Sequence, residues 1–184
     1  MARFSLSRVI KRDGDESLLR AYARGDNEAF NTLYLRHKDG LYNFIVRVLA
    51  QPAAAEEIAQ EVWMVVIDQA SRLELRNAAF RTWLYKVASN KVADFFRRKV
   101  NHSEELDQEL LIASGLTSDD RVLLAQVLSA LNKLPEEQRI AFVLQQEGFS
   151  HREIAEVTGV SAETVKSRLR YAKSATRQRM ELKA

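Results

Sequence analysis

The stretch that decides the fold runs Ser150-His-Arg-Glu-Ile-Ala-Glu-Val-Thr-Gly-Val-Ser-Ala-Glu-Thr-Val-Lys-Ser-Arg-Leu-Arg-Tyr-Ala172. Ser150 and Glu153 have the spacing of a capping box, in which the serine hydroxyl accepts from the Glu153 amide and the carboxylate reaches back to the Ser150 amide. Gly159 suits the left-handed residue that ends a helix, and Ser161 suits the cap of the next helix. The stretch therefore predicts two helices joined by a tight turn, which is the helix-turn-helix arrangement.

The second helix of this stretch has an apolar face and a basic face on a helical wheel. The side chains expected to face inward are Ala162, Val165, Leu169 and Ala172. Lys166 and Arg170 lie one turn apart on the outer face, so both can donate to guanine O6 and N7 in one major groove. Ser167 lies between them, and Arg168 and Lys173 flank them at positions suited to phosphates. The pattern favours DNA binding over the alternative, a helix pair in a protein-interaction module.

Composition limits the classes of protein that fit. The chain has 184 residues, 46% of them hydrophobic, and a net charge of +3. It has no cysteine, which excludes disulfides and thiolate zinc sites, and its three histidines lack the spacing of metal ligands. No apolar run is long enough to span a bilayer and the first residues do not resemble a signal peptide, so we expect a cytoplasmic protein. We expect no cofactor and no metal.

Helical periodicity runs through the chain and strand signals are absent, which predicts an all-α fold. Helices are expected at 15–24, 27–49, 52–71, 80–98, 119–133, 136–147, 151–158 and 162–179. Residues 100–118 are acidic and rich in turn formers, and we interpret them as a flexible linker between domains at 1–99 and 119–184. Such a linker could reach at most roughly 65 Å, about two turns of B-DNA, so the two domains could contact separate sites on one duplex.

The helix expected at 80–98 carries a polar stripe opposite its apolar arc. The stripe contains Trp83, Lys86, Asn90 and Arg97, within about 60° of one another on the wheel. An aromatic ring interleaved with an amide and cations suits an unstacked base and its phosphates. The alternative is that Trp83 packs against another helix and that the cations are only solvated.

The segment at 54–73 has an acidic face instead. Glu57, Glu61 and Asp68 lie opposite its aliphatic positions, with Gln60 and Met64 nearby. Such a face disfavours DNA. It is either a solvated surface or a docking surface for a basic protein, with Trp63 and Met64 supplying apolar contact.

Stretches from three regions of the chain together resemble the bacterial RNA polymerase sigma factors of the extracytoplasmic-function (ECF) group. Ala55-Glu-Glu-Ile-Ala-Gln-Glu-Val-Trp63 resembles the segment that grips the β′ clamp helices of the polymerase. Phe80-Arg-Thr-Trp-Leu-Tyr-Lys-Val-Ala-Ser-Asn-Lys91, continued to Arg98, resembles the segment that meets the minus-ten promoter element. Leu134-Pro-Glu-Glu-Gln-Arg139, Gly148-Phe-Ser-His-Arg-Glu-Ile-Ala155 and Thr164-Val-Lys-Ser-Arg-Leu169 resemble the domain that reads the minus-thirty-five element.

The resemblance implies a role for each surface in promoter-specific initiation, with core RNA polymerase (β′ clamp helices and β flap), promoter DNA and an anti-sigma factor as partners. The polymerase-binding candidates are Glu56, Glu57, Gln60, Glu61 and Met64. The minus-ten candidates are Arg76, Asn77, Trp83, Lys86, Asn90, Arg97 and Arg98. The upstream-element candidates are Arg152, Thr164, Lys166, Ser167, Arg168, Arg170, Lys173 and Arg177.

Two other classes of protein remain as alternatives. One is a helix-turn-helix repressor or activator that dimerises through its N-terminal domain and binds a palindrome without polymerase. The other, more remote, is a nucleic-acid-processing enzyme. The sequence lacks a metal cluster, a phosphate-binding loop and a nucleophile–base pair, so we expect no catalysis by this chain.

Overall fold

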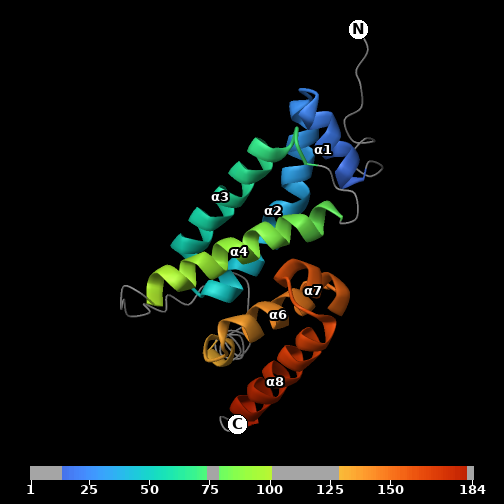
Figure 1. Cartoon of the computed structure of the whole chain (residues 1–184). Coiled ribbons are helices and arrows are strands. Elements are labelled where there is room, and N and C mark those ends of the chain that lie inside the picture. The colour runs from blue at the N-terminus through green and yellow to red at the C-terminus, as the bar shows by residue number, and fades with distance from the viewer. Residues whose placement is uncertain (1–13, 74–78, 101–128, 182–184) are drawn as a thin grey trace.

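The computed structural model describes residues 14–73, 79–100 and 129–181 (Figure 1). The helices are α1 (Asp15–Ala23), α2 (Asn27–Leu49), α3 (Pro52–Gln69), α4 (Phe80–Val100), α6 (Glu136–Gln146), α7 (His151–Thr158) and α8 (Ala162–Glu181). Residues 129–132 are also helical, and the described ranges contain no strand. The predicted all-α class is confirmed. The expected linker at 100–118 and most of the helix expected at 119–133 lie outside the described residues.

Local sequence signals set the helix ends. The Asp26 carboxylate accepts from the amides of Glu28 and Ala29 and caps α2, and Pro52 occupies the first turn of α3, where its missing amide costs nothing. A residue of another helix caps the first amide of α4, because Phe80 N donates to the Glu16 carboxylate of α1 at 3.0 Å. This bond ties α1 to the start of α4.

The four N-terminal helices share an apolar core. Phe44 on α2 and Phe80 and Leu84 on α4 are fully buried, and α3 adds the aliphatic side chains of Ile58, Val62 and Val66. Truncating one of the phenylalanines to alanine would cost about 3–5 kcal/mol of folding free energy. The rigid face that α3 and α4 present to solvent depends on this core.

The C-terminal helices bury the predicted inner face of α8. Val165, Leu169 and Ala172 are buried, and Ile154 and Val157 of α7 meet them. Ala162 was expected to face inward, and that prediction was wrong, because Ala162 is exposed. It lies at the first position of α8, where the described chain does not cover it.

The two groups of helices also pack on each other. In Figure 1, α4 crosses above α6 and α7, with α8 running away from it toward the C-terminus. Buried side chains of α2 and α4 join those of α6, α7 and α8 in one continuous apolar cluster. Helical periodicity does not predict this contact between the two halves.

Candidate nucleic-acid interface

The turn between α7 and α8 has the geometry that its sequence predicts. Ser150 Oγ accepts from Glu153 N at 3.3 Å, and the Glu153 carboxylate accepts from Ser150 N at 2.8 Å. These bonds to Ser150 lower the pKa of Glu153. Gly159 has a φ of 68°, and Ser161 Oγ accepts from Thr164 N at 3.1 Å to cap α8. The helix-turn-helix therefore fixes the direction in which α8 leaves the core.

The outer face of α8 presents most of the predicted upstream-DNA residues to solvent. The exposed members are Arg152 on α7 and Lys166, Ser167, Arg170, Lys173 and Arg177 on α8. Lys166 Nζ donates to Glu163 at 2.7 Å, one turn earlier, and this ion pair lowers the pKa of the Glu163 carboxyl. Glu163 thus holds the lysine on the outer face, where it is available to a groove.

Two upstream-DNA candidates are engaged within the C-terminal helices. The Arg168 side chain is only 17% exposed, and its Nη2 donates to Glu137 of α6 at 2.6 Å. The Thr164 hydroxyl lies 2.9 Å from Ser161 Oγ. Tyr171 was missed by the sequence reasoning. It is 57% exposed, and the Arg170 guanidinium lies 5.3 Å from the centre of its ring. The signal available in the sequence was an aromatic residue directly after Arg170.

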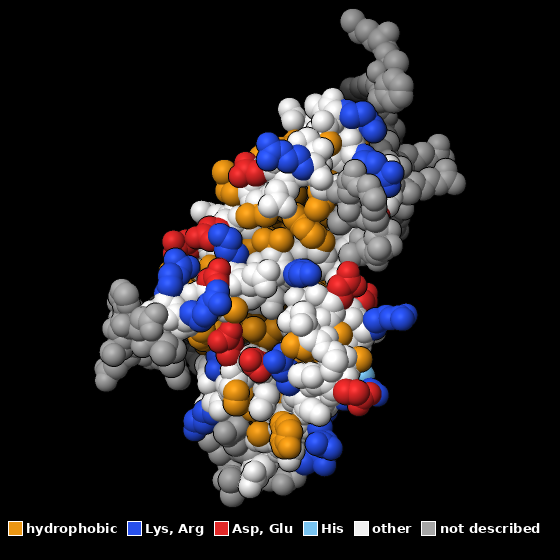
Figure 2. Space-filling view, in the orientation of Figure 1, with side chains coloured by type: hydrophobic (Ala, Val, Ile, Leu, Met, Phe, Trp, Pro, Cys, Tyr) orange, Lys and Arg blue, Asp and Glu red, His pale blue; other side chains and the backbone are white. Residues whose placement is uncertain are grey.

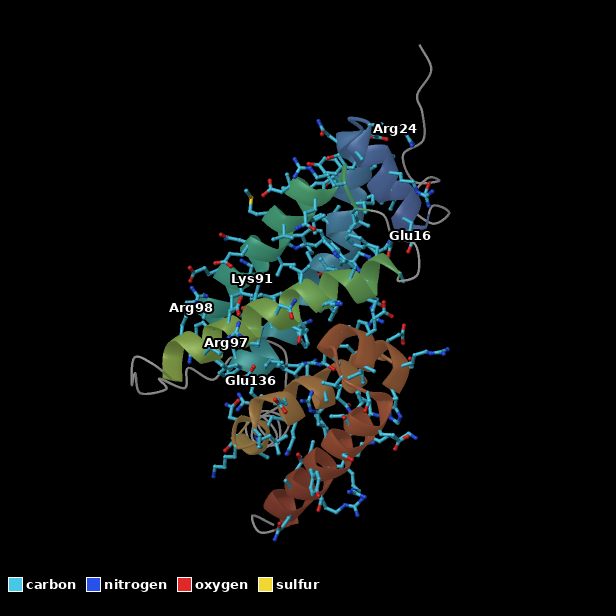
Figure 3. All side chains as sticks on the ribbon, in the orientation of Figure 1. Glu16, Arg24, Lys91, Arg97, Arg98 and Glu136 are labelled. Carbon is cyan, nitrogen blue, oxygen red and sulfur yellow. The ribbon has the colours of Figure 1, made fainter. Side chains whose placement is uncertain are left out.

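The predicted stripe on α4 is solvent-facing for most of its length. Lys86, Asn90, Arg97 and Arg98 are exposed, and Arg97 is paired with Asp94. Trp83 is half-buried, with its ring centre 6.0 Å from that of Phe80. Figure 3 shows Lys91, Arg97 and Arg98 along the half of α4 that lies away from α1. The remaining minus-ten candidates, Arg76 and Asn77, lie outside the described residues.

The acidic face of α3 is exposed next to this stripe. Glu56, Glu57, Gln60 and Met64 face solvent, and Met64 is 57% exposed. Glu61 is half-buried and accepts from Lys91 Nζ at 2.7 Å. Acidic and basic side chains gather over the region where α3 and α4 lie side by side (Figure 2).

The expected role of Trp63 in the apolar contact was wrong. Trp63 is only 7% exposed, because Phe30 and Tyr34 of α2 pack against its ring at centre distances of 6.0 and 5.0 Å. Ile67 of α3 and Leu35 of α2, which the sequence reasoning did not select, are exposed instead. Acidic residues around exposed apolar side chains suit a protein partner with a basic rim.

The described residues carry little further site chemistry. Among residues 14–73, 79–100 and 129–181, no group of three or more histidine, cysteine, aspartate or glutamate side chains could hold a metal ion. His37 is used structurally, with Nε2 2.7 Å from the Asp15 carboxylate. None of the described helices is both long and apolar enough to cross a bilayer.

Separate parts of the chain match two protein families. Residues 33–101 match Sigma-70 region 2, which includes α3, α4 and most of α2. Residues 124–175 match Sigma-70, region 4, which includes α6, α7 and most of α8. The order of the two matches is the order of the stretches identified in the sequence.

Individual relatives agree with these matches. The chain is 30% identical over 155 residues to the ECF RNA polymerase sigma factor SigM of Mycobacterium tuberculosis, covering 84% of this chain and 78% of the relative. It is 28% identical over 173 residues to the ECF sigma factor SigW of Bacillus subtilis, covering 85% and 91%. The sigma factor RpoE of Bartonella quintana, solved with the anti-sigma factor NepR, has a similar fold, with a TM-score of 0.73, 20% identity and coverage of 85% and 99%.

Proposed function

The chain belongs to the ECF group of RNA polymerase sigma factors and directs promoter-specific initiation of transcription, and we propose that three of its exposed surfaces divide the work of initiation. The acidic face of α3 binds core polymerase, the polar stripe of α4 holds the minus-ten strand, and the outer face of α8 reads the upstream duplex. The chain carries no catalytic step of its own and acts in the cytoplasm, where polymerase synthesises the RNA.

Core binding is assigned to α3 because its exposed charge excludes a nucleic-acid partner. Glu56 and Glu57 are exposed and would repel phosphates, whereas they complement the basic rim of a protein surface. Met64 and Ile67 are exposed between the charges and provide the apolar centre that such interfaces need. The proposed contact is with the β′ clamp helices, while the C-terminal helices meet the β flap.

Promoter melting is assigned to α4. Extruding a base from a duplex costs a few kcal/mol, and stacking on an aromatic ring returns about 1–3 kcal/mol. Trp83 offers the ring, and Lys86 and Arg98 are exposed on the same helix as partners for the strand's phosphates. Asn90 has the donors and the acceptor needed to contact a base edge. The binding free energy of the unpaired strand thus offsets the cost of opening the duplex.

Upstream recognition is assigned to α8. Lys166 and Arg170 are exposed one turn apart and can enter one major groove, while Arg177 and Arg152 neutralise phosphates at its edges. The capped turn after Gly159 holds this helix in a fixed direction from the domain core. The exposed basic face on a capped helix-turn-helix is the observation that carries the proposal.

Transcription in vitro with purified core enzyme and mapping of the start site test the proposal. We expect a defined start only when this chain is added, and footprinting should protect both promoter elements only when core polymerase is present. A dimer that protects a palindrome without polymerase would favour a repressor or activator and reject the assignment of surfaces.

An anti-sigma protein is a further proposed partner. RpoE of Bartonella quintana was solved with such a protein, and its fold is similar to that of this chain. The exposed apolar side chains of α2 and α3, Leu35, Met64 and Ile67, are available to be covered. A protein bound there would compete directly with core polymerase.

A further inference from the structure

The first turn of α4 receives its cap from α1 instead of from the residue that precedes it. Ala79 stands directly before the helix and has no side-chain oxygen, whereas serine, threonine, aspartate or asparagine usually caps a helix from that position. Glu16 supplies an acceptor, because its carboxylate accepts from Phe80 N at 3.0 Å. Figure 3 shows Glu16 beside the end of α4 that lies nearest α1. A bond across 64 positions of sequence therefore replaces a local one.

Asp15, the residue before Glu16, supports the ring of the same phenylalanine through His37. The Asp15 carboxylate lies 2.7 Å from His37 Nε2 and also forms an ion pair with Arg36. The ring centre of His37 lies 5.4 Å from that of Phe80. Burial raises the pKa of Asp15, but the contacts with His37 and Arg36 outweigh burial and lower the pKa below its usual value. Asp15 is therefore a carboxylate that holds His37 against Phe80.

Phe80 in turn supports the tryptophan of the α4 stripe. Its side chain is fully buried, so its ring cannot shift without displacing its neighbours. The ring of Trp83, one turn later, lies 6.0 Å from the Phe80 ring between centres, with an angle of 37° between the two planes. Trp83 is only half-buried, so part of its surface is open to a partner. The chain of contacts thus runs from α1 through Phe80 to Trp83.

These polar contacts go beyond what is needed to hold α1 on the other helices. Leu18 and Leu19 are buried and already anchor α1 in the apolar core. The carboxylates of Asp15 and Glu16 act instead on the first turn of α4 and on the ring beside it. Both residues precede the range 33–101 that matches Sigma-70 region 2, whereas Phe80 lies within it. A segment before the matched region therefore reaches the proposed minus-ten surface.

We propose that Glu16 and Asp15 are positioning residues for the minus-ten contact, which fix Phe80 and thereby the ring of Trp83; this role rests on the proposed function of α4. Stacking on a base requires a ring at a defined place and angle, and a side chain keeps such a geometry only where its neighbours lock it. The two carboxylates are unsuited to touch the strand themselves, because its phosphates carry the same sign of charge.

The position of Trp83 can be followed without DNA or polymerase. The chain has two tryptophans, so Trp63→Phe leaves Trp83 as the only one. In this background Glu16→Ala should shift the Trp83 emission to longer wavelength and increase its quenching by acrylamide, because the ring loses its fixed support. Glu16→Gln should keep the parent spectrum, since its amide oxygen can accept the same bond. Glu28→Ala is the matched control, at a glutamate exposed in the first turn of α2.

A local cap separates positioning from simple stabilisation of α4. Ala79→Ser places a hydroxyl before the helix, where it can accept from an amide of the first turn but cannot connect that turn to α1. Combined with Glu16→Ala, it also supports folding if the single variant does not fold. We expect the Trp83 emission to remain shifted in the combined variant. A parent spectrum in the combined variant, or in Glu16→Ala alone, would overturn the proposal.

Promoter opening in the holoenzyme measures the consequence for the strand. Glu16→Ala should reduce the permanganate reactivity of unpaired thymines roughly three- to tenfold, and Glu16→Gln should restore most of it. Because α1 is proposed to act through Trp83, the same change in a Trp83→Ala background should cause no further loss. An equal further loss in that background would overturn the proposal, since α1 would then affect opening by another route.

The two measurements also distinguish failure of this proposal from failure of the proposed function. If Trp83→Ala opens the promoter normally, the proposed contact of Trp83 with the strand is rejected. The emission of Trp83 in the free chain still decides whether Glu16 positions the ring. If Trp83→Ala blocks opening while Glu16→Ala leaves both emission and opening unchanged, the function of α4 stands and the positioning role of α1 is rejected.

Discussion

Lys91 Nζ of α4 donates to the Glu61 carboxylate of α3 at 2.7 Å. Both side chains are about one-third exposed, so solvent screens the pair and its contribution to stability is small. Its importance is positional, because it joins the acidic face proposed to bind polymerase to the helix proposed to bind the minus-ten strand. A change at Glu61 therefore alters two surfaces, and its effects must be separated with controls.

Glu61→Arg should weaken binding to core polymerase by about 1–2 kcal/mol, roughly tenfold, because a cation replaces an anion facing a basic partner. Binding of the C-terminal helices to upstream duplex should be unchanged. Glu57→Arg is the matched variant, since Glu57 is exposed on the same face and has no contact with Lys91 in the structure. Titration of fluorescent core polymerase measures both. Full transcription by both variants would reject the docking assignment.

Arg170→Ala should cost about 1–3 kcal/mol of binding to the preferred upstream sequence, with a smaller loss on sequences lacking the guanine. The reason is that Arg170 is exposed on the central stripe of α8, where a bidentate contact is possible. Lys173→Ala, expected to remove a phosphate contact, should weaken all sequences alike and reduce the salt dependence. Fluorescence anisotropy on a set of single-base variants distinguishes the outcomes. An equal loss on every sequence would show that Arg170 touches only the backbone.

Asn90→Ala should reduce promoter opening roughly fivefold, which corresponds to the loss of one hydrogen bond of about 1 kcal/mol to a base. Asn90 is exposed in the middle of the α4 stripe. Permanganate reactivity of unpaired thymines in the holoenzyme–promoter complex measures the opening. Duplex binding at the upstream element serves as the internal control and should not change. Normal thymine reactivity would remove Asn90 from the proposed contacts.

Much of the fold could be predicted because its signals are local. Ser150, Glu153 and Gly159 specify caps within one turn of chain, and the structure places α7 at 151–158, the predicted range. Wheel positions such as Val165 and Leu169 are buried because a 3.6-residue period fixes their common direction. The same reasoning was wrong for Ala162, which is exposed. A position on the inner side of the wheel is buried only where a neighbouring element covers it, and nothing in the described chain covers the first turn of α8.

The missed features depend on residues distant in sequence. Trp63 is buried because Phe30 and Tyr34 cover it from another helix, which no pattern within 54–73 reveals. No role for Arg81 or Arg139 follows from the sequence, whereas in the structure they donate to the backbone carbonyls of Glu147 and Val48. Sequence periodicity identifies faces of helices, but it does not identify which faces meet.

Ser150→Ala should lower the stability of the C-terminal helices by about 1 kcal/mol, a shift of roughly 2–4 °C in the midpoint of thermal unfolding. The Ser150 bonds lower the pKa of Glu153 below its usual value of 4.5, so the folded state favours the carboxylate. That contribution is fully present above pH 4.5 and is lost as the pH falls below it. The difference in midpoint between wild type and Glu153→Gln should therefore shrink under acidic conditions. A difference that is constant with pH would contradict the capping role of the carboxylate.

Tyr85 should make the alkaline stability of the chain depend on the packing of α4 against the C-terminal helices. Burial, followed by the negative charge of Glu147, raises the pKa of Tyr85 from 10.0 to about 12. The folded state therefore favours the neutral phenol. Its contribution is complete below pH 10, and it is lost as the pH rises toward 12, because the unfolded chain releases the proton first.

Denaturant unfolding at pH 9, 10 and 11 should show a steeper loss of stability in the wild type than in Tyr85→Phe. Glu147→Gln should lower the pKa of Tyr85, because removing the charge of Glu147 removes one of the causes that raise it. Absorbance of tyrosinate near 295 nm follows this ionisation. If Glu147→Gln leaves the last tyrosine to ionise unchanged, α6 and α4 are not in contact in solution. The same titration would then contradict the packing of the two groups of helices on each other, without any polymerase or DNA present.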